Sequence, residues 1–207
     1  MADYEAPRDG GRAVEIDATR ADTVASAPVR RLPGDRVETI EQMIRVDHAG
    51  EYGAARIYAG QLAVMGDRSA VSAEIAQMKA QEARHLATFD RLIVERRVRP
   101  TVLHPLWHVA GYALGAATAL LGPKAAMACT VAVETEIDRH YAAQRAVLDA
   151  NPGEDAELAA HIADFQADEV EHRDTAAGYV GGSPGFGLMS AVIRAGCRAA
   201  IAVTKRI

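Results

Sequence analysis

The stretch DFQADEVEHR, residues 164–173, places a glutamate and a histidine three positions apart, Glu169 and His172. A second stretch, QEARHLATF, carries the same spacing in Glu82 and His85. In a helix, residues three apart lie on one face, so each pair directs one carboxylate and one imidazole toward the same point. Both stretches therefore predict helices that bring metal-ligand side chains together.

Both pairs interrupt an apolar stripe at positions where an aliphatic side chain is expected. The apolar residues around the first pair are Val71, Ile75, Met78, Phe89 and Leu92, and those around the second are Leu158, Ile162, Phe165, Ala176 and Tyr179. Their spacing of three or four residues is typical of the buried face of a helix. An unpaired carboxylate in such a core is strongly unfavourable. Positive charge is therefore expected between the two helices.

One further glutamate takes a core position on the helix before each pair. Glu51 precedes Glu82 by 31 residues, and Glu134 precedes Glu169 by 35, so the two halves look like repeated helix hairpins. Glu136 points away from the same stripe and is interpreted as a solvated surface charge. The repeat predicts four carboxylates in one interior.

The whole chain is predicted to be all-α. Helix-forming residues dominate its 207 residues, aromatic residues make up 5%, and no stretch alternates with a period of two. The predicted elements are a disordered tail over residues 1–34 and a single domain over 35–207, with helices over about 36–65, 69–97, 123–148, 154–179 and 186–207 and with Asp35 and Ser69 as the first two N-caps. This order predicts a four-helix bundle with a crossover segment and an additional C-terminal helix.

Charge and cysteine usage exclude some classes of function. The net charge of -5 argues against nucleic acid as a partner. Cys129 and Cys197 lie in apolar helical contexts without CxxC spacing, so they are interpreted as buried structural thiols. The acidic N-terminus lacks the apolar stretch of a secretory signal peptide.

Residues 100–123 contain no Asp, Glu, Lys or Arg, although a quarter of the chain is charged. A buried crossover helix, a transmembrane span and a helix lying in or on one leaflet are the three open interpretations. Trp107 and Tyr112 favour the third, because such side chains suit the membrane interface. The final segment, 186–207, is a basic amphipathic helix that suits docking on the bundle or on an anionic membrane equally well.

Four carboxylates and two imidazoles in a four-helix bundle predict a di-iron or di-manganese carboxylate site of the ferritin-like type. The predicted metal ligands are Glu51, Glu82, His85, Glu134, Glu169 and His172. Oxygen-rich ligation suits iron or manganese better than structural zinc. We expect Glu82 and Glu169 to bridge two metals and the other two glutamates to be terminal. A metal-free polar network is disfavoured, because it lacks positive charge to balance four buried carboxylates.

Roles around the predicted ligands are less defined. Asp47 and Asp138 are candidates to accept the outer N–H of a ligating histidine, and a solvated position is the alternative for each. His48 is interpreted as a hydrogen-bonded core histidine rather than a ligand. Tyr58 and Tyr141 each lie seven residues after the core glutamate of their helix. They are either ordinary core residues or catalytic residues that hydrogen-bond or transfer electrons beside the metals.

Several longer stretches closely resemble the demethoxyubiquinone hydroxylase family of ubiquinone biosynthesis. They are IRVDHAGEYGAARIYAGQ (44–61), QEARHLATF (81–89), MACTVAVETEID (127–138), FQADEVEHRD (165–174), the charge-free LHPLWHVAGYALGAATALLG and the terminal AGCRAAIAV. The resemblance covers about residues 36–207 and matches all six family ligands at the positions given above.

The resemblance implies a membrane-associated, non-haem di-iron monooxygenase with two iron ions per chain, peripheral on the cytoplasmic face of the inner membrane. It would hydroxylate the ring of a polyprenyl demethoxyquinone with O2. NADH or a separate reductase would supply electrons, and both stay open because no strand-to-helix GxGxxG fingerprint exists. A homo-oligomer or a lipid-carrying partner is compatible with the apolar surfaces.

Two other classes of function remain open on residues alone. A ferritin-like iron-oxidising or peroxide-scavenging protein would share the ligands, but it would not need a charge-free crossover helix. A metal-free helical scaffold on a membrane surface would explain the apolar segments, but not six ionisable residues in core positions.

Overall fold

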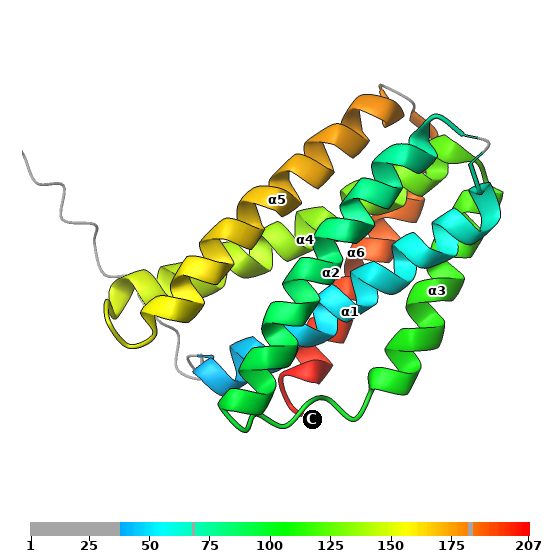
Figure 1. Cartoon of the computed structure of the whole chain (residues 1–207). Helices are drawn as coiled ribbons and strands as arrows, with labels where there is room; N and C mark the ends of the chain where they lie inside the picture. Colours follow the sequence, from blue (N-terminus) through cyan, green and yellow to red (C-terminus); the bar gives the residue numbers. More distant parts are fainter. Residues whose placement is uncertain (1–37, 68, 182–183) are drawn as a thin grey trace, which may run out of the picture. The chain divides into compact units, whose positions relative to one another are not determined.

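The computed structural model describes residues 38–67, 69–181 and 184–207, and these residues form helices and no strand, which confirms the all-α prediction. The predicted tail over residues 1–34 lies outside the described residues. The helices are α1 (Ile40–Met65), α2 (Val71–Glu95), α3 (His104–Leu120), α4 (Pro123–Ala150), α5 (Ala156–Val180) and α6 (Gly187–Thr204), with a short 3-10 turn, η1 (Pro184–Phe186), before α6 (Figure 1).

The starts of α1 and α2 both differ from the prediction, since α1 begins at Ile40 and the N-cap of α2 is Ala70 rather than Ser69. The Thr39 hydroxyl accepts from the Gln42 N–H at 3.2 Å, and the Gln42 side chain accepts from the Thr39 N–H at 3.0 Å. This reciprocal capping box satisfies two free donors and starts the helix later than residue 36. Asp35, the predicted cap, lies outside the described residues. Before α2, the Ser69 hydroxyl accepts from the Val71 N–H at 3.3 Å.

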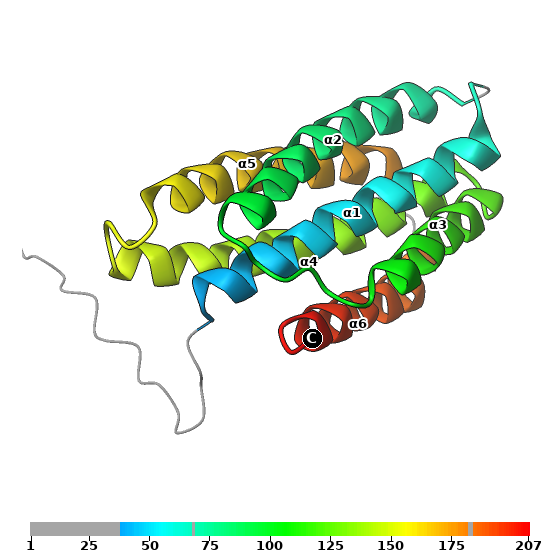
Figure 2. The same cartoon turned by 60° about the horizontal axis from the view of Figure 1, so that its bottom comes forward.

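Two helix hairpins, α1 with α2 and α4 with α5, pack together as a ferritin-like four-helix bundle (Figures 1 and 2). Two of the three apolar clusters formed by the described residues lie at opposite ends of the bundle. One contains Met43, Ile44, Phe89, Leu92, Val98, Tyr141, Leu148, Leu158, Ile162 and Phe165, and the other contains Ala54, Tyr58, Met65, Val71, Ile75, Met78, Ala119, Ala126, Met127 and Ala176. Each large apolar side chain buried there stabilises the fold by about 1.5–3 kcal/mol. The polar residues singled out from the sequence lie between the two clusters.

Helix α3 packs on α1 through glycines that bring the two backbones close together. A Cβ atom added to Gly115 would overlap the backbone of Ile57, and one added to Gly60 would overlap the Tyr112 carbonyl oxygen. Gly111 and Gly115 therefore act as a close-packing pair within the chain.

The interpretation of residues 100–123 as a buried crossover helix is wrong. The buried residues of α3 are Gly115, Thr118 and Ala119, all in its C-terminal half. Val109 is 64% exposed and Leu106 is 53% exposed. Because only one face of α3 meets α1, the rest of this apolar helix faces outward beside α6 (Figure 2).

Helix α6 packs on α4 and buries a charge that the sequence analysis placed on the surface. Glu136 is only 3% exposed, and its carboxylate accepts a 2.7 Å hydrogen bond from Arg198 of α6. The prediction of a solvated Glu136 is wrong because the docking of α6 covers this face of α4. By length and composition, α6 is the one described helix that could cross a bilayer, and 11% of it is buried.

The two cysteines differ in burial. Cys129 is buried, as predicted, whereas Cys197 is only partly buried because it borders a groove beside α6. Burial raises the pKa of each thiol to about 12. Neither thiol is therefore ionised at neutral pH, which agrees with a structural role.

Candidate metal centre

The six predicted ligands converge in the middle of the bundle, and all six are buried. They form two overlapping groups in which one potential ligand atom per residue lies within 4.8 Å of the others. One group is Glu51, Glu82, His85 and Glu169, and the other is Glu82, Glu134, Glu169 and His172. Glu82 and Glu169 belong to both groups. This shared membership is the arrangement expected of carboxylates that bridge two metal positions.

Each imidazole presents its Nδ1 atom to the carboxylates. His85 Nδ1 lies 3.1 Å from a Glu169 oxygen and 3.2 Å from a Glu51 oxygen. His172 Nδ1 lies 3.3 Å from oxygens of both Glu82 and Glu169. The three-residue spacing within α2 and α5 thus directs Nδ1 of each histidine toward the buried carboxylates in both motifs.

The donor set fits two divalent cations. Four carboxylate oxygens of the centre, both of Glu82, one of Glu134 and one of Glu169, accept no well-aligned hydrogen bond from the described residues, although His85 Nδ1 lies 3.1 Å from the Glu169 oxygen. Burial, together with the charge of Glu169, raises the pKa of Glu82 and of Glu134 well above the usual range. Two divalent cations would balance four carboxylate charges and coordinate the unpaired oxygens.

A protonated His85 would supply part of the missing positive charge in the metal-free protein. Burial disfavours the charged form of His85, but hydrogen bonds to Glu169 and Glu51 raise its pKa to about 10. Burial likewise disfavours ionised Glu169, but hydrogen bonds from His172 and His85 lower its pKa to about 2. The carboxylates around His85 thus favour its protonated form in the metal-free protein, and a metal ion bound at Nδ1 would have to displace this proton.

Both tyrosines predicted as candidates contact the centre. The Tyr58 hydroxyl donates to Glu134 Oε1 at 2.6 Å, and the Tyr141 hydroxyl donates to Glu51 Oε1. Burial and nearby carboxylates raise the pKa of both tyrosines well above 10, so both hydroxyls keep their protons. Each hairpin thus provides the hydroxyl that holds the core glutamate of the other.

Neither Asp47 nor Asp138, the two candidate partners, hydrogen-bonds to a histidine of the centre. Asp47 is buried, but its carboxylate contacts His140 at 3.2 Å and accepts from Gln144 at 2.8 Å. Asp138 accepts from Arg173 at 2.7 Å. Both side chains turn to neighbours beside the centre, because the faces of α1 and α4 that carry them do not face the histidines.

The actual partners were missed by the sequence analysis. His85 Nε2 lies 2.9 Å from Asp168 Oδ2, and His172 Nε2 lies 2.9 Å from Gln81 Oε1. Asp168 immediately precedes Glu169, and Gln81 immediately precedes Glu82. A hydrogen-bonding residue directly before each Glu-x-x-His pair is therefore the sequence signal that could have found them. His48 is buried and lies 2.9 Å from Asp90, in agreement with a hydrogen-bonded core histidine.

An apolar groove of about 420 Å³ lies between α1, α3, α4 and α6. Its lining includes Gly50 and Gly53 of α1, Val133 of α4, Trp107 of α3 and Val192 of α6. A Cβ atom added to either glycine would meet no atom within 4 Å, so both leave open space. Glu51 directly follows Gly50, and Glu134 directly follows Val133, so the groove runs beside two residues of the centre.

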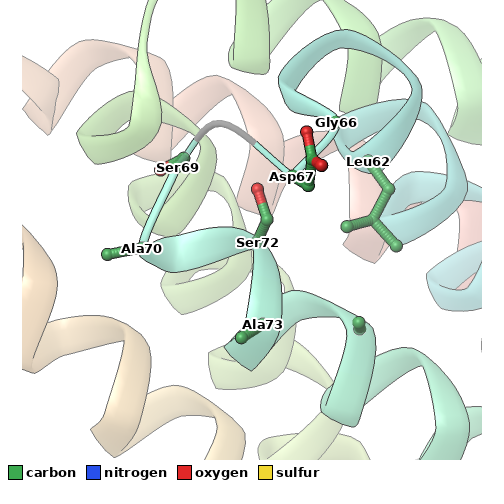
Figure 3. Close-up of a pocket in the computed structure, with 8 residues that line it drawn as sticks. Leu62, Gly66, Asp67, Ser69, Ala70, Ser72 and Ala73 are labelled. Carbon is green, nitrogen blue, oxygen red and sulfur yellow. The ribbon is translucent and has the colours of Figure 1, made fainter.

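A second hollow, of about 520 Å³, lies around the end of α1 and the start of α2 (Figure 3). Its lining includes Leu62, Asp67, Ser69 and Ser72. It contains none of the six converging side chains.

Comparison with known proteins identifies a family and several relatives. The model of a family described as ubiquinone biosynthesis protein COQ7 matches residues 38–204 of the chain. A Rhodospirillum rubrum protein named 3-demethoxyubiquinol 3-hydroxylase is 53% identical over 182 residues, which cover 86% of this chain and 84% of the relative.

Two animal relatives carry the name NADPH-dependent 3-demethoxyubiquinone 3-hydroxylase, mitochondrial. The Mus musculus protein is 51% identical over 169 residues, which cover 81% of this chain and 77% of the relative. The Homo sapiens protein is 49% identical over 170 residues, which cover 81% of this chain and 78% of the relative. The residues matched by the family model include all six converging side chains.

Proposed function

Because the chain belongs to the COQ7 family of ubiquinone biosynthesis proteins, we propose that it is a non-haem di-iron monooxygenase. It hydroxylates the ring of a polyprenyl demethoxyubiquinone. The single observation that carries the proposal is the buried convergence of four carboxylates and two imidazoles in two groups that share Glu82 and Glu169. A metal-free polar network would have to hold extra protons on these buried groups and would leave buried carboxylate oxygens without a well-aligned hydrogen bond.

Each metal position would have one terminal glutamate and one histidine. Glu51 and His85 would serve the first, and Glu134 and His172 would serve the second, with the two shared glutamates between them. When bound, two iron ions would supply the reduction of O2 and the transfer of one oxygen atom to the ring.

The two tyrosines would orient the terminal glutamates. Tyr141 holds one oxygen of Glu51, and Tyr58 holds one oxygen of Glu134, so the second oxygen of each remains directed to the centre. Both hydroxyls also keep protons next to the reacting region, and hydroxylation with O2 consumes two electrons and two protons per turnover. A hydrogen-bonding role for Tyr58 and Tyr141 therefore supports catalysis without making either a ligand.

The apolar groove suits the quinone substrate. Its lining is almost entirely apolar and includes residues of the outward-facing helices α3 and α6. We place the isoprenoid tail between these helices and the ring over Gly50 and Gly53, beside Glu51. Burial of a hydrocarbon tail in such a groove is favourable by about 25 cal/mol for each Å² removed from water.

The same two helices would place the protein on a membrane. Exposed apolar residues of this face include Val109 of α3 and Leu188 of α6, which are 64% and 80% exposed. Arg198 in the middle of α6 is tied to Glu136, so α6 lies on the bundle and is not free to cross a bilayer alone. We propose peripheral attachment, with α3 and α6 in the interface, on the cytoplasmic face of the inner membrane.

Three sources could supply the two electrons that each turnover needs. The animal relatives are named as NADPH-dependent, which supports a reduced nicotinamide as the donor for those proteins. A separate reductase is a second source. A quinol substrate, as in the name of the Rhodospirillum rubrum relative, would bring two electrons of its own.

The deciding experiment combines metal analysis with product analysis. Purified protein is loaded with ferrous iron without O2, and a demethoxyquinone, NADH or NADPH, and O2 are then added. About two irons per chain and a ring-hydroxylated product support the proposal. Iron uptake and oxidation without this product, with a reductase also supplied, would favour a ferritin-like iron-oxidising protein. Absence of metal binding would favour the membrane scaffold.

A ligand variant tests the residues themselves. Glu169→Ala should abolish hydroxylation and lower the iron content, because it removes a carboxylate shared by both groups. The helical circular dichroism signal should remain largely unchanged. Full activity in this variant would contradict the ligand assignment.

A further inference from the structure

The outer nitrogens of the two centre histidines have chemically different partners. His85 Nε2 lies 2.9 Å from the carboxylate of Asp168, whereas His172 Nε2 lies 2.9 Å from the amide oxygen of Gln81. Asp168 belongs to α5 and reaches across to α2, and Gln81 belongs to α2 and reaches across to α5. The two contacts are therefore counterparts in a repeated structure, but one acceptor carries a negative charge and the other is neutral.

The direction of both hydrogen bonds follows from the orientation of the rings. The Nδ1 atoms of His85 and His172 face the buried carboxylates at 3.1–3.3 Å. When Nδ1 binds a metal ion, Nε2 carries the hydrogen and must donate it. A carboxylate accepts such a bond more strongly than an amide and pushes more electron density into the ring.

The surroundings hold Asp168 in place as a charged acceptor. Arg84 contacts Asp168 and also Asp164, the latter at 2.7 Å. The side chain of Asp168 is only 18% exposed. The ring of Phe165 stacks on the ring of His85, with 4.1 Å between the two centroids. The geometry of the His85–Asp168 pair is therefore restrained from both sides.

We propose that Asp168 and Gln81 are positioning residues that make the two metal positions inequivalent. The position served by His85 and Glu51 binds ferrous iron more tightly than the position served by His172 and Glu134. This inference rests on the proposed di-iron function and deepens it, because it predicts which metal position fills first.

The test is a stepwise, oxygen-free titration with 57Fe(II), read by competition with a ferrous chelator and by Mössbauer spectroscopy. Wild-type protein should bind two irons with separate affinities, and the first equivalent should give one ferrous doublet. Asp168→Asn should weaken the tighter step by about 10-fold or more, within the range known for outer partners of ligating histidines. Its first equivalent should then divide between two doublets.

Two further variants separate this effect from general charge and from folding. Gln81→Glu places a carboxylate beside His172 and should strengthen the weaker of the two iron-binding steps. Asp164→Asn removes a carboxylate from the same Arg84 but does not contact His85, so it should leave both affinities within about twofold. If Asp168→Asn does not fold, Gln81→Glu carries the test alone.

The outcomes distinguish the inference from the proposed function. A wild-type protein that binds no iron contradicts the proposed function. Two bound irons of equal affinity, or an unchanged tighter step in Asp168→Asn, contradict the inference alone. Equal weakening by Asp164→Asn and Asp168→Asn would also overturn it, because a general charge effect would then suffice.

Discussion

The hydroxyl of Tyr58 on α1 donates a 2.6 Å hydrogen bond to Oε1 of Glu134 on α4. Its counterpart runs in the opposite direction, from Tyr141 on α4 to Glu51 on α1. Each hairpin thus donates one tyrosine hydroxyl hydrogen bond to a glutamate carboxylate of the other. These two hydrogen bonds restrain the carboxylates of Glu134 and Glu51 in the metal-free protein.

Tyr58→Phe should destabilise the metal-free protein by about 1–3 kcal/mol, because the buried Glu134 loses its donor. Turnover should fall, while two irons should still bind. Urea denaturation, iron analysis and product formation measure the three effects. Tyr179→Phe is the matched control, since this partly exposed tyrosine has only a 3.4 Å contact with Glu74. Equal stability losses in both variants would contradict the predicted role.

Gly115→Ala should destabilise the protein by about 1–3 kcal/mol, the usual cost of an overpacked contact. The added methyl group would overlap the backbone of Ile57 and push α3 away from α1. Urea denaturation measures the loss, and hydrogen exchange should show faster opening of α3. Gly178→Ala is the control, because its Cβ would meet nothing within 4 Å and alanine favours the helix. A stabilised Gly115→Ala protein would show that the close packing is not required.

Gly53→Leu should raise KM for the quinone at least several-fold without lowering iron content. The leucine side chain would fill part of the apolar groove, because Gly53 lines it and a Cβ atom added there has open space. Steady-state kinetics with long-tailed and short-tailed quinones provide the measurement, and the loss should be larger for the substrate that occupies more of the groove. Gly178→Leu, on exposed helix surface, should leave KM unchanged. An unchanged KM in Gly53→Leu would place the substrate elsewhere.

The metal-free protein should become less stable as pH rises from about 5.5 to 8. Burial, with neighbouring carboxylates, raises the pKa of Glu82 and Glu134 well above 4.5, and hydrogen bonds raise the pKa of His85 to about 10 against the effect of burial. The folded chain therefore holds protons that the unfolded chain releases. Each such proton contributes a slope of up to about 1.4 kcal/mol per pH unit.

The low pKa of Glu169, about 2, does not change this sign, because its contribution is complete above pH 4.5. Iron binding should release protons and grow tighter as pH rises, so the loaded protein should show the opposite trend. Urea denaturation at several pH values, with chelator and with ferrous iron, compares the two forms. A metal-free protein that is more stable at pH 8 than at pH 5.5 would contradict the prediction.

The sequence predicted the bundle helices because their apolar stripes repeat over several turns. It also predicted which ionisable residues share the interior, since Glu51, Glu134 and the two Glu-x-x-His pairs occupy core positions of those stripes. The start of α1 was predicted too early in the chain, because the capping box of Thr39 and Gln42 satisfies two backbone donors and begins the helix at Ile40.

The burial of Glu136 and the exposure of α3 were not predictable in the same way. Glu136 is buried only because α6, more than fifty residues later in the chain, docks on its face of α4 and supplies Arg198. Helix α3 is apolar throughout, so its sequence does not reveal which face meets α1 and which stays open.

The sequence by itself determined the helices, their inward faces and the six ionisable residues within them, because helical periodicity is a local property of the chain. Only the tertiary structure decided the contacts between helices. Asp168 faces His85, and Gln81 faces His172, because of how α2 and α5 are rotated and aligned against each other. That alignment results from packing of the whole core, to which residues distant in the chain contribute, so no local pattern encodes it.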